Sequence, residues 1–132
     1  MTVGVSTTNV ANKWLDVIRT SGTSFTAVTS AWVRLHTGDP GASGTANGAA
    51  GDTTRKSVTH NAASSGSITI NGTSGPWTNG GTSETITHVS VWDASSAGNF
   101  LYSAALSSSQ AWNSGNTFTL NALTVSISPL AA

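Results

Sequence analysis

The side chains of this chain that could do acid–base or metal chemistry are few and widely spaced. They are His36, His60, His88, Asp39, Asp52 and Asp93. A metal site needs imidazole and carboxylate ligands at defined spacings, but no His-Glu-x-x-His element occurs, and the three histidines fall on three different predicted strands. We therefore predict structural or surface histidines and no metal site. The alternative is a site on an oligomer axis, where symmetry would multiply the ligands.

Nucleophilic and glycosidase chemistry find no better support. Serine is abundant, yet no Gly-x-Ser-x-Gly elbow is present, and the chain has no cysteine. Glu84 is the only glutamate, so nothing in the pattern joins two carboxyls at the ~5–9.5 Å that glycoside hydrolysis needs. The glycine-rich stretch 38–51 lacks the Gly-Lys-Ser/Thr element of a phosphate cradle. We expect no catalytic residues, no cofactor and no enzyme activity.

The tryptophans allow two interpretations. They are Trp14, Trp32, Trp77, Trp92 and Trp112. Trp77, Trp92 and Trp112 lie near Asn and Asp residues and could form a sugar-stacking surface. Alternatively they are core residues, since each indole can bury ~150–250 Å². Over 84–92, Trp92 shares a face with Ile86 while the valines occupy the other, which predicts a strand covered on both sides.

Residues 31–36 alternate between apolar and polar side chains, which predicts a half-buried strand. Val33 and Leu35 share its apolar face. The strand should end at the Gly-Asp-Pro-Gly turn that follows, because Pro40 fixes its own φ and disfavours helix before it. The loop 38–52 is long for a compact domain, and such loops are usually functional or mobile. We expect it to wrap a neighbouring subunit.

The remaining elements predict one domain, 1–132. Residues 1–7 read as an unstructured or strand-adding arm, and 8–22 as a short amphipathic helix. Further strands are predicted at 55–62, 67–71, 84–92, 99–106 and 117–128. A phase shift near Asn121 predicts a bulge or tight reversal in the last one. The predicted fold is all-β: a two-sheet β-sandwich over 31–128, jelly-roll-like or immunoglobulin-like, with one short N-terminal α-helix.

Charge and hydropathy limit the kinds of partner that the chain is expected to bind. The formal net charge is zero, which favours association over free diffusion. The cations are Lys13, Arg19, Arg34, Arg55 and Lys56. They are too few and too scattered for the 6–10 phosphate contacts of a typical DNA-binding protein, so we predict no direct nucleic-acid binding. No apolar run approaches the ~20 residues of a membrane span, and the start lacks the pattern of a signal peptide, so we expect no membrane association.

Several segments carry a family resemblance. They are VRLHTGDPG at 33–41, GTAN at 44–47, TRKSVT at 54–59, THVSVWDA at 87–94, GNFL at 98–101 and LTV at 123–125. In this order they resemble the LHTGDPG signature and later segments of small bacteriophage virion structural proteins, which are usually called tail-fibre or minor capsid proteins. Thr53 stands where that family usually has an aromatic residue. The resemblance implies a virion part.

We therefore predict a capsid decoration (minor capsid) protein that stabilises the head as a homo-oligomer, with a trimer favoured. Its partners would be itself and the major capsid protein, and its place the capsid surface of a virion assembled in the bacterial host cytoplasm. One alternative is a tail-fibre or receptor-binding module that recognises host glycan; another is a secreted bacterial carbohydrate-binding or adhesin domain. The candidate interface residues are Thr2, Val3, Val5, Trp14, Ile18, His36, Asp39, Pro40, Thr45 and Asn47.

Overall fold

The computed structural model describes residues 3–19 and 26–128, and strands dominate this part of the chain. The elements are β1 (Gly4–Val5), a π-helical turn η1 (Thr7–Ala11), α1 (Asn12–Asp16), β2 (Ala31–His36), β3 (Lys56–His60), β4 (Ser67–Asn71), β5 (Ser74–Thr78), β6 (Glu84–Trp92), β7 (Phe100–Trp112), β8 (Thr117–Leu120) and β9 (Thr124–Ser126). The all-β prediction with one short N-terminal helix is confirmed.

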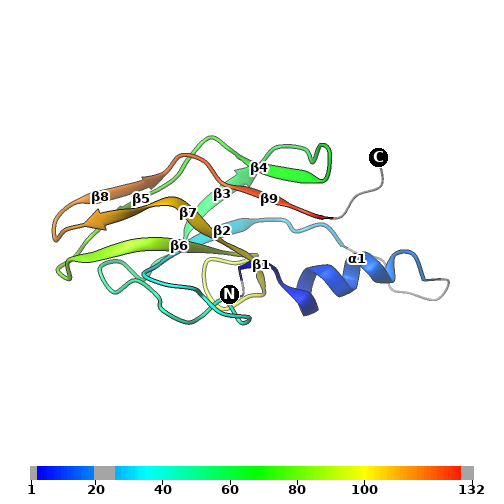
Figure 1. Ribbon diagram of the computed structural model, residues 1–132, viewed down its shortest axis with the longest axis horizontal. Helices are drawn as coiled ribbons and strands as arrows, with labels where there is room; N and C mark the ends of the chain where they lie inside the picture. Colours follow the sequence, from blue (N-terminus) through cyan, green and yellow to red (C-terminus); the bar gives the residue numbers. More distant parts are fainter. Residues whose placement is uncertain (1–2, 20–25, 129–132) are drawn as a thin grey trace.

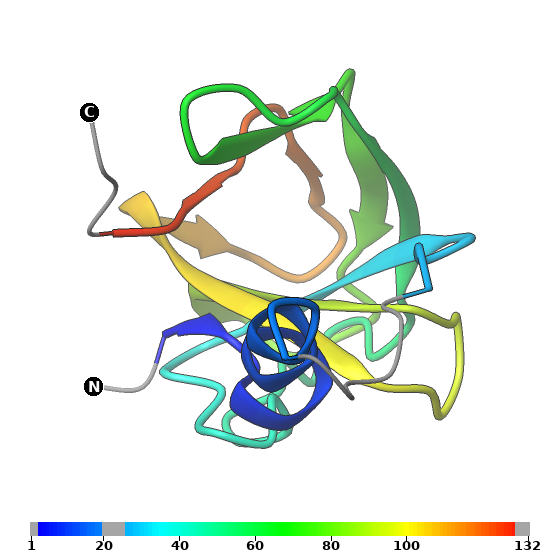
Figure 2. The ribbon, with the colours of Figure 1, turned by 90° about the vertical axis from the view of Figure 1, so that its right-hand side faces the viewer.

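The strands form one curled sheet closed by a small ribbon. Seven antiparallel strands follow the order β1-β7-β6-β2-β3-β4-β9, and β5 pairs with β8. Viewed along the long axis, the sheet turns until β9 approaches β7 again, so the sandwich is nearly closed and barrel-like (Figure 2). β5 and β8 lie at one end of the molecule and α1 at the other (Figure 1).

The core follows from alternation along the central strands. Val33 and Leu35 of β2 are completely buried, as are Val89 and Val91 of β6. Because the side chains of a strand point alternately to its two faces, these four residues share the inner face of the sheet. The opposite face of β6 is covered as well, since Trp92 is also buried. The predicted strand with two covered faces is therefore confirmed.

Two tryptophans fill the interior. Trp77 and Trp112 are almost inaccessible, and each indole still finds a hydrogen-bond acceptor. The N–H of Trp77 donates to the carbonyl of Thr54 over 2.9 Å, and that of Trp112 donates to the carbonyl of Asn116 over 2.9 Å. These bonds let the rings lie in the core without leaving a buried polar atom unpaired.

The structure departs from the predicted boundaries in the second half of the chain. The segment 117–128 splits into β8 and β9, as the phase shift at Asn121 predicted. β7 extends six residues beyond the predicted end at 106, because a register shift opposite Ile86 and His88 lets it pair with β6 again. β5 was not predicted, because its Gly75-Pro76 pair reads as a turn signal.

The N-terminal segment is also more broken than predicted. Gly4–Val5 forms β1 and adds to β7, so the strand-adding option for the arm holds. The predicted helix 8–22 is divided into η1 and α1, and its last predicted residues, 20–22, lie outside the described residues. The Ser6 hydroxyl caps the start by accepting from the Asn9 amide. In the ranges 3–19 and 26–128, no helix is long and apolar enough to cross a membrane.

Candidate functional site

His36 joins the end of β2 to the long loop and to β6. Its side chain is completely buried, with Nδ1 2.7 Å from the carbonyl oxygen of Ala46 and Nε2 2.7 Å from the Ser90 hydroxyl. Burial lowers the pKa of His36 to about 4, and the charge of Arg34 lowers it further, against the hydrogen bond to Ala46. A carbonyl can only accept, so Nδ1 donates to Ala46 and the neutral ring accepts at Nε2. His36 is a structural clamp.

The loop 38–52 folds onto its own chain. It pairs back along the end of β2, where the amide of Thr37 donates to the carbonyl of Asn47 and the amide of Ala49 to that of Leu35. At its far end the Glu84 carboxylate accepts from the amides of residues 50 and 51. The loop is thus anchored at both ends by hydrogen bonds of the same chain.

This anchoring corrects part of the predicted interface. His36 and Pro40 are buried inside the chain, so their side chains are not on a surface that a partner could contact. The physical reason is the backbone: a glycine-rich loop can approach a sheet closely and satisfy its amides there. Thr45 and Asn47 are exposed and Asp39 is partly exposed, so their roles at an interface remain predictions.

The N-terminal segment presents a different surface. Leu15, Val17 and Ile18 are 63%, 60% and 83% exposed, and Trp14 is 37% exposed. Val3 and Val5 are half-buried, and Thr2 lies outside the described residues. Trp14 and Ile18 therefore lie where a partner could reach them, and their role at an interface stays a prediction. Several large apolar side chains exposed within one short segment are typical of an interaction surface.

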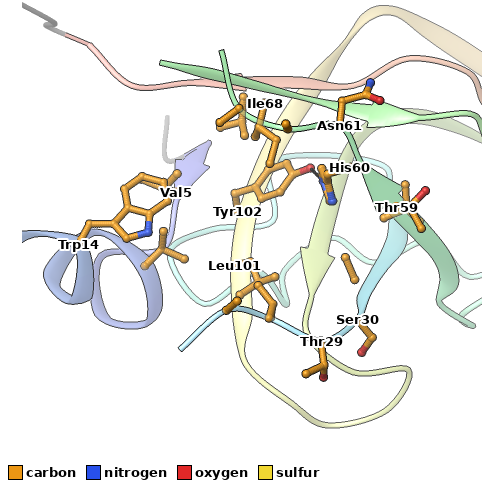
Figure 3. Close-up of a pocket in the computed structure, with 18 residues that line it drawn as sticks. Val5, Trp14, Thr29, Ser30, Thr59, His60, Asn61, Ile68, Leu101 and Tyr102 are labelled. Atoms are coloured by element: carbon orange, nitrogen blue, oxygen red, sulfur yellow. Dashed lines mark hydrogen bonds between the residues drawn. The ribbon is translucent and has the colours of Figure 1, made fainter. Parts of the chain in front are cut away.

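A mostly apolar groove of about 570 Å³ lies beside this segment (Figure 3). It opens between the helical segment, β7 and the ends of β3 and β4. Val5, Trp14, Ile68 and Leu101 are among the side chains that line it. No Asp, Glu, Lys or Arg belongs to the described residues that line this groove. Such a lining suits an apolar occupant rather than a charged substrate.

The polar feature of the groove is the pair His60 and Tyr102. His60 Nε2 and the Tyr102 hydroxyl oxygen are 2.7 Å apart, and the two rings meet edge to face (Figure 3). Burial lowers the pKa of His60 and raises the pKa of Tyr102, so both are neutral at pH 7. The Tyr102 hydroxyl and Nε2 of His60 therefore satisfy each other, and the pair adds no charge to the groove.

The chemistry-bearing residues do not converge. His36 is clamped under the loop, His60 lies in the groove, and His88 makes a hydrogen bond with the Thr87 hydroxyl. Within the described ranges, no three His, Cys, Asp or Glu side chains gather where they could hold a metal ion. The sugar-stacking interpretation of Trp77, Trp92 and Trp112 is wrong, because these rings are 0%, 6% and 1% exposed.

Sequence reasoning missed the groove and its histidine–tyrosine pair. These two residues are 42 positions apart, and neither stands in a pattern that indicates a pairing. The alternation in 99–106 could place Tyr102 on the buried face of a strand, but it could not say which strand would face it. The exposed helix was found, because its apolar stripe is a local pattern.

Comparison with known proteins gives one informative result. A family described as Gp80, podophage GP4 fiber I protein gp80, matches residues 4–128. The matched range includes the helical segment, the groove and the loop. No curated protein matches the chain.

Proposed function

The chain belongs to the family described as podophage GP4 fiber I protein gp80, and on that premise we propose that it is a fibre subunit that works by assembly. The predicted phage virion structural protein is confirmed at this level. The observation that carries the proposal is the extent of the family match, which takes in the whole described fold except Val3. A fibre is built from repeated subunits, so its proteins need surfaces that bind one another.

The family description favours a fibre over the head surface. Capsid decoration and contact with the major capsid protein therefore stay predictions, and the fibre alternative becomes the main proposal. The glycan-recognition part of that alternative loses support, because the three tryptophans assigned to it are core residues.

The described geometry supports a role without catalysis. The groove has an apolar lining and a neutral hydrogen-bonded pair, and His36 has both ring nitrogens occupied. A general base needs a free nitrogen or carboxylate within hydrogen-bond reach of a substrate proton. His36 offers none, because both of its ring nitrogens are hydrogen-bonded inside the chain. We propose that the protein is not an enzyme.

A second copy of the chain is the proposed occupant of the groove and of the exposed helical segment. Charge supports a self-contact: the chain is neutral overall, and Arg19 pairs with Asp16 over 2.9 Å beside the apolar residues. A convex apolar ridge and a concave apolar groove on one molecule allow a head-to-tail contact, which closes into a ring or continues as a filament. The predicted trimer is one such ring. A stable contact of this kind buries ~1,200–2,000 Å².

Antibody labelling of intact phage particles tests the proposed place in the virion. An antibody against this chain, viewed by electron microscopy, should label the fibres and leave the head surface bare. Label spread over the head would support capsid decoration and contradict the fibre proposal. Particles lacking the protein serve as the control for unspecific label.

A further inference from the structure

Arg34 lies near the middle of β2, on the face of the sheet opposite the core. Its Nε is buried and makes no hydrogen bond, and the guanidinium forms no ion pair with any other described residue. A buried polar atom without a partner costs free energy. An ion bound from outside is one of the recognised explanations of such an atom in a native protein.

The surroundings of Arg34 are positively charged. Arg55 stacks on the Trp92 ring at 3.9 Å and donates to the carbonyls of Ala94 and Ala97. Burial lowers the pKa of Arg55, the charge of Arg34 lowers it further, and Asp93 opposes them. The two guanidinium groups are therefore close enough to repel each other electrostatically.

The nearby acid, Asp93, offsets only one of these two positive charges. Both carboxylate oxygens of Asp93 already accept hydrogen bonds from Asn99, over 2.7 and 2.8 Å. His36, the neighbour of Arg34 on β2, is neutral at pH 7 because burial lowers its pKa to about 4, so it adds no charge here. The local field therefore favours an anion.

The long loop forms one wall of the site. A Cβ atom built on Gly48 would overlap Nη2 of Arg34, so the loop backbone passes directly over the guanidinium. Gly48 has no positive φ, and the need for glycine here comes from the close approach alone. Since His36 and Glu84 anchor this loop, the wall is rigid, which suits a preformed binding site.

We propose that the guanidinium of Arg34, under the loop at Gly48, binds an oxyanion: a phosphate or a carboxylate group. The planar fork of an arginine can donate two parallel hydrogen bonds to either group. Arg55 adds charge but few bonds, because its Nη1 is already used. The inference does not depend on the fibre proposal, because it rests on a different face of the sheet.

Thermal unfolding of the full chain with added anion tests this site. Inorganic phosphate and acetate are titrated separately at constant ionic strength, and the saturable rise in Tm gives a Kd for each. Comparison of the two probes separates a phosphate from a carboxylate preference. The wild-type protein should respond to at least one of them. Absence of a saturable rise with both would overturn the proposal.

Three variants and one control, K13Q, test whether the rise in Tm comes from anion binding at Arg34. R34Q should abolish it, and R34K, which keeps the charge but loses the fork, should raise the Kd about tenfold. G48A keeps every charged group and displaces the guanidinium, so it should weaken binding even if R34Q fails to fold. K13Q removes an equal charge from the helical segment and should bind like wild type. An unchanged Kd in both R34K and G48A would overturn the assignment to Arg34.

Discussion

The loop 38–52 and the N-terminal helical segment 7–19 differ in a way that their compositions do not suggest. The loop is rich in Gly, Ala and Ser, yet it is pinned by His36, by the Glu84 carboxylate and by pairing along β2. The helical segment carries large apolar side chains, yet Leu15 and Ile18 remain mostly exposed. The polar segment is therefore the firmly attached one, and the apolar segment is the one with surface to offer.

The difference shows that whether a segment is held against the sheet depends on the hydrogen-bonding and apolar groups around it, and not on its hydropathy alone. A loop without large side chains can bring its amides and carbonyls close to a sheet edge, where each finds a hydrogen bond. An apolar side chain is buried only if other apolar atoms surround it. For Leu15 and Ile18, the described part of this chain supplies few of them. This is why we propose that the loop stabilises the fold of the single chain and that the helical segment contacts other subunits.

The largest expected effect comes from loosening the loop at Gly44. Its φ is 73°, and a Cβ atom there would overlap the ring of Phe100. The left-handed backbone costs an alanine ~1–2 kcal/mol, and displacing a packed ring costs ~1–3 kcal/mol. We expect G44A to lower the free energy of unfolding by about 2–4 kcal/mol, measured by urea denaturation.

Gly72 provides the matched control for this variant. It has a similar φ of 78°, but a Cβ atom there would meet nothing within 4 Å. G72A should therefore show the backbone cost without the clash. Equal losses in G44A and G72A would mean that the loop is not packed against Phe100, and the comparison between the two segments would fail.

A second test uses acid, which should release the same loop. The unfolded His36 titrates near 6.5 and the folded one near 4, so below pH 6.5 the unfolded state binds the proton more readily. Stability is therefore full above pH 6.5 and falls as the pH drops to about 4, by about 3 kcal/mol. Urea denaturation at a series of pH values measures the slope.

Replacing the histidines assigns that slope. H36Q should flatten it strongly, and H60Q should flatten it less, because burial lowers the pKa of His60 by a smaller amount. The slope is measured within each variant, so a constant loss of stability in H36Q does not disturb the comparison. An unchanged slope in H36Q would show that the loop is not held by a neutral His36.

The smallest effect on stability is expected in the helical segment, together with a large effect on assembly. The double variant L15S/I18S changes two exposed side chains, so the free energy of unfolding should stay within about 0.5 kcal/mol. Sedimentation should show loss of self-association. I127S is the control, since Ile127 is exposed but belongs neither to the helix nor to the groove lining. Undiminished association of the double variant would contradict the proposed contact.

Local patterns in the sequence predicted much of the fold. The bounds of β2, β4 and β6 agree with the predicted ranges, because alternation along a strand is written in neighbouring residues. The attachment of the loop was not predictable in this way, since His36 and Ser90 are 54 positions apart. The same limit applies to Arg34. The sequence could not show that the loop passes over its guanidinium or that its buried Nε has no hydrogen-bond acceptor.

The distribution of tryptophans gives the molecule two separate optical probes. The indoles of Trp77 and Trp112 are sealed in the interior, whereas Trp14 is exposed on the helical segment. A water-soluble quencher such as iodide should therefore quench the emission of Trp14, and in part that of the half-buried Trp32, and leave the interior pair untouched. Shielding of Trp14 at rising protein concentration would follow subunit association, and a red shift of the quencher-resistant emission would follow unfolding, both within one unlabelled sample.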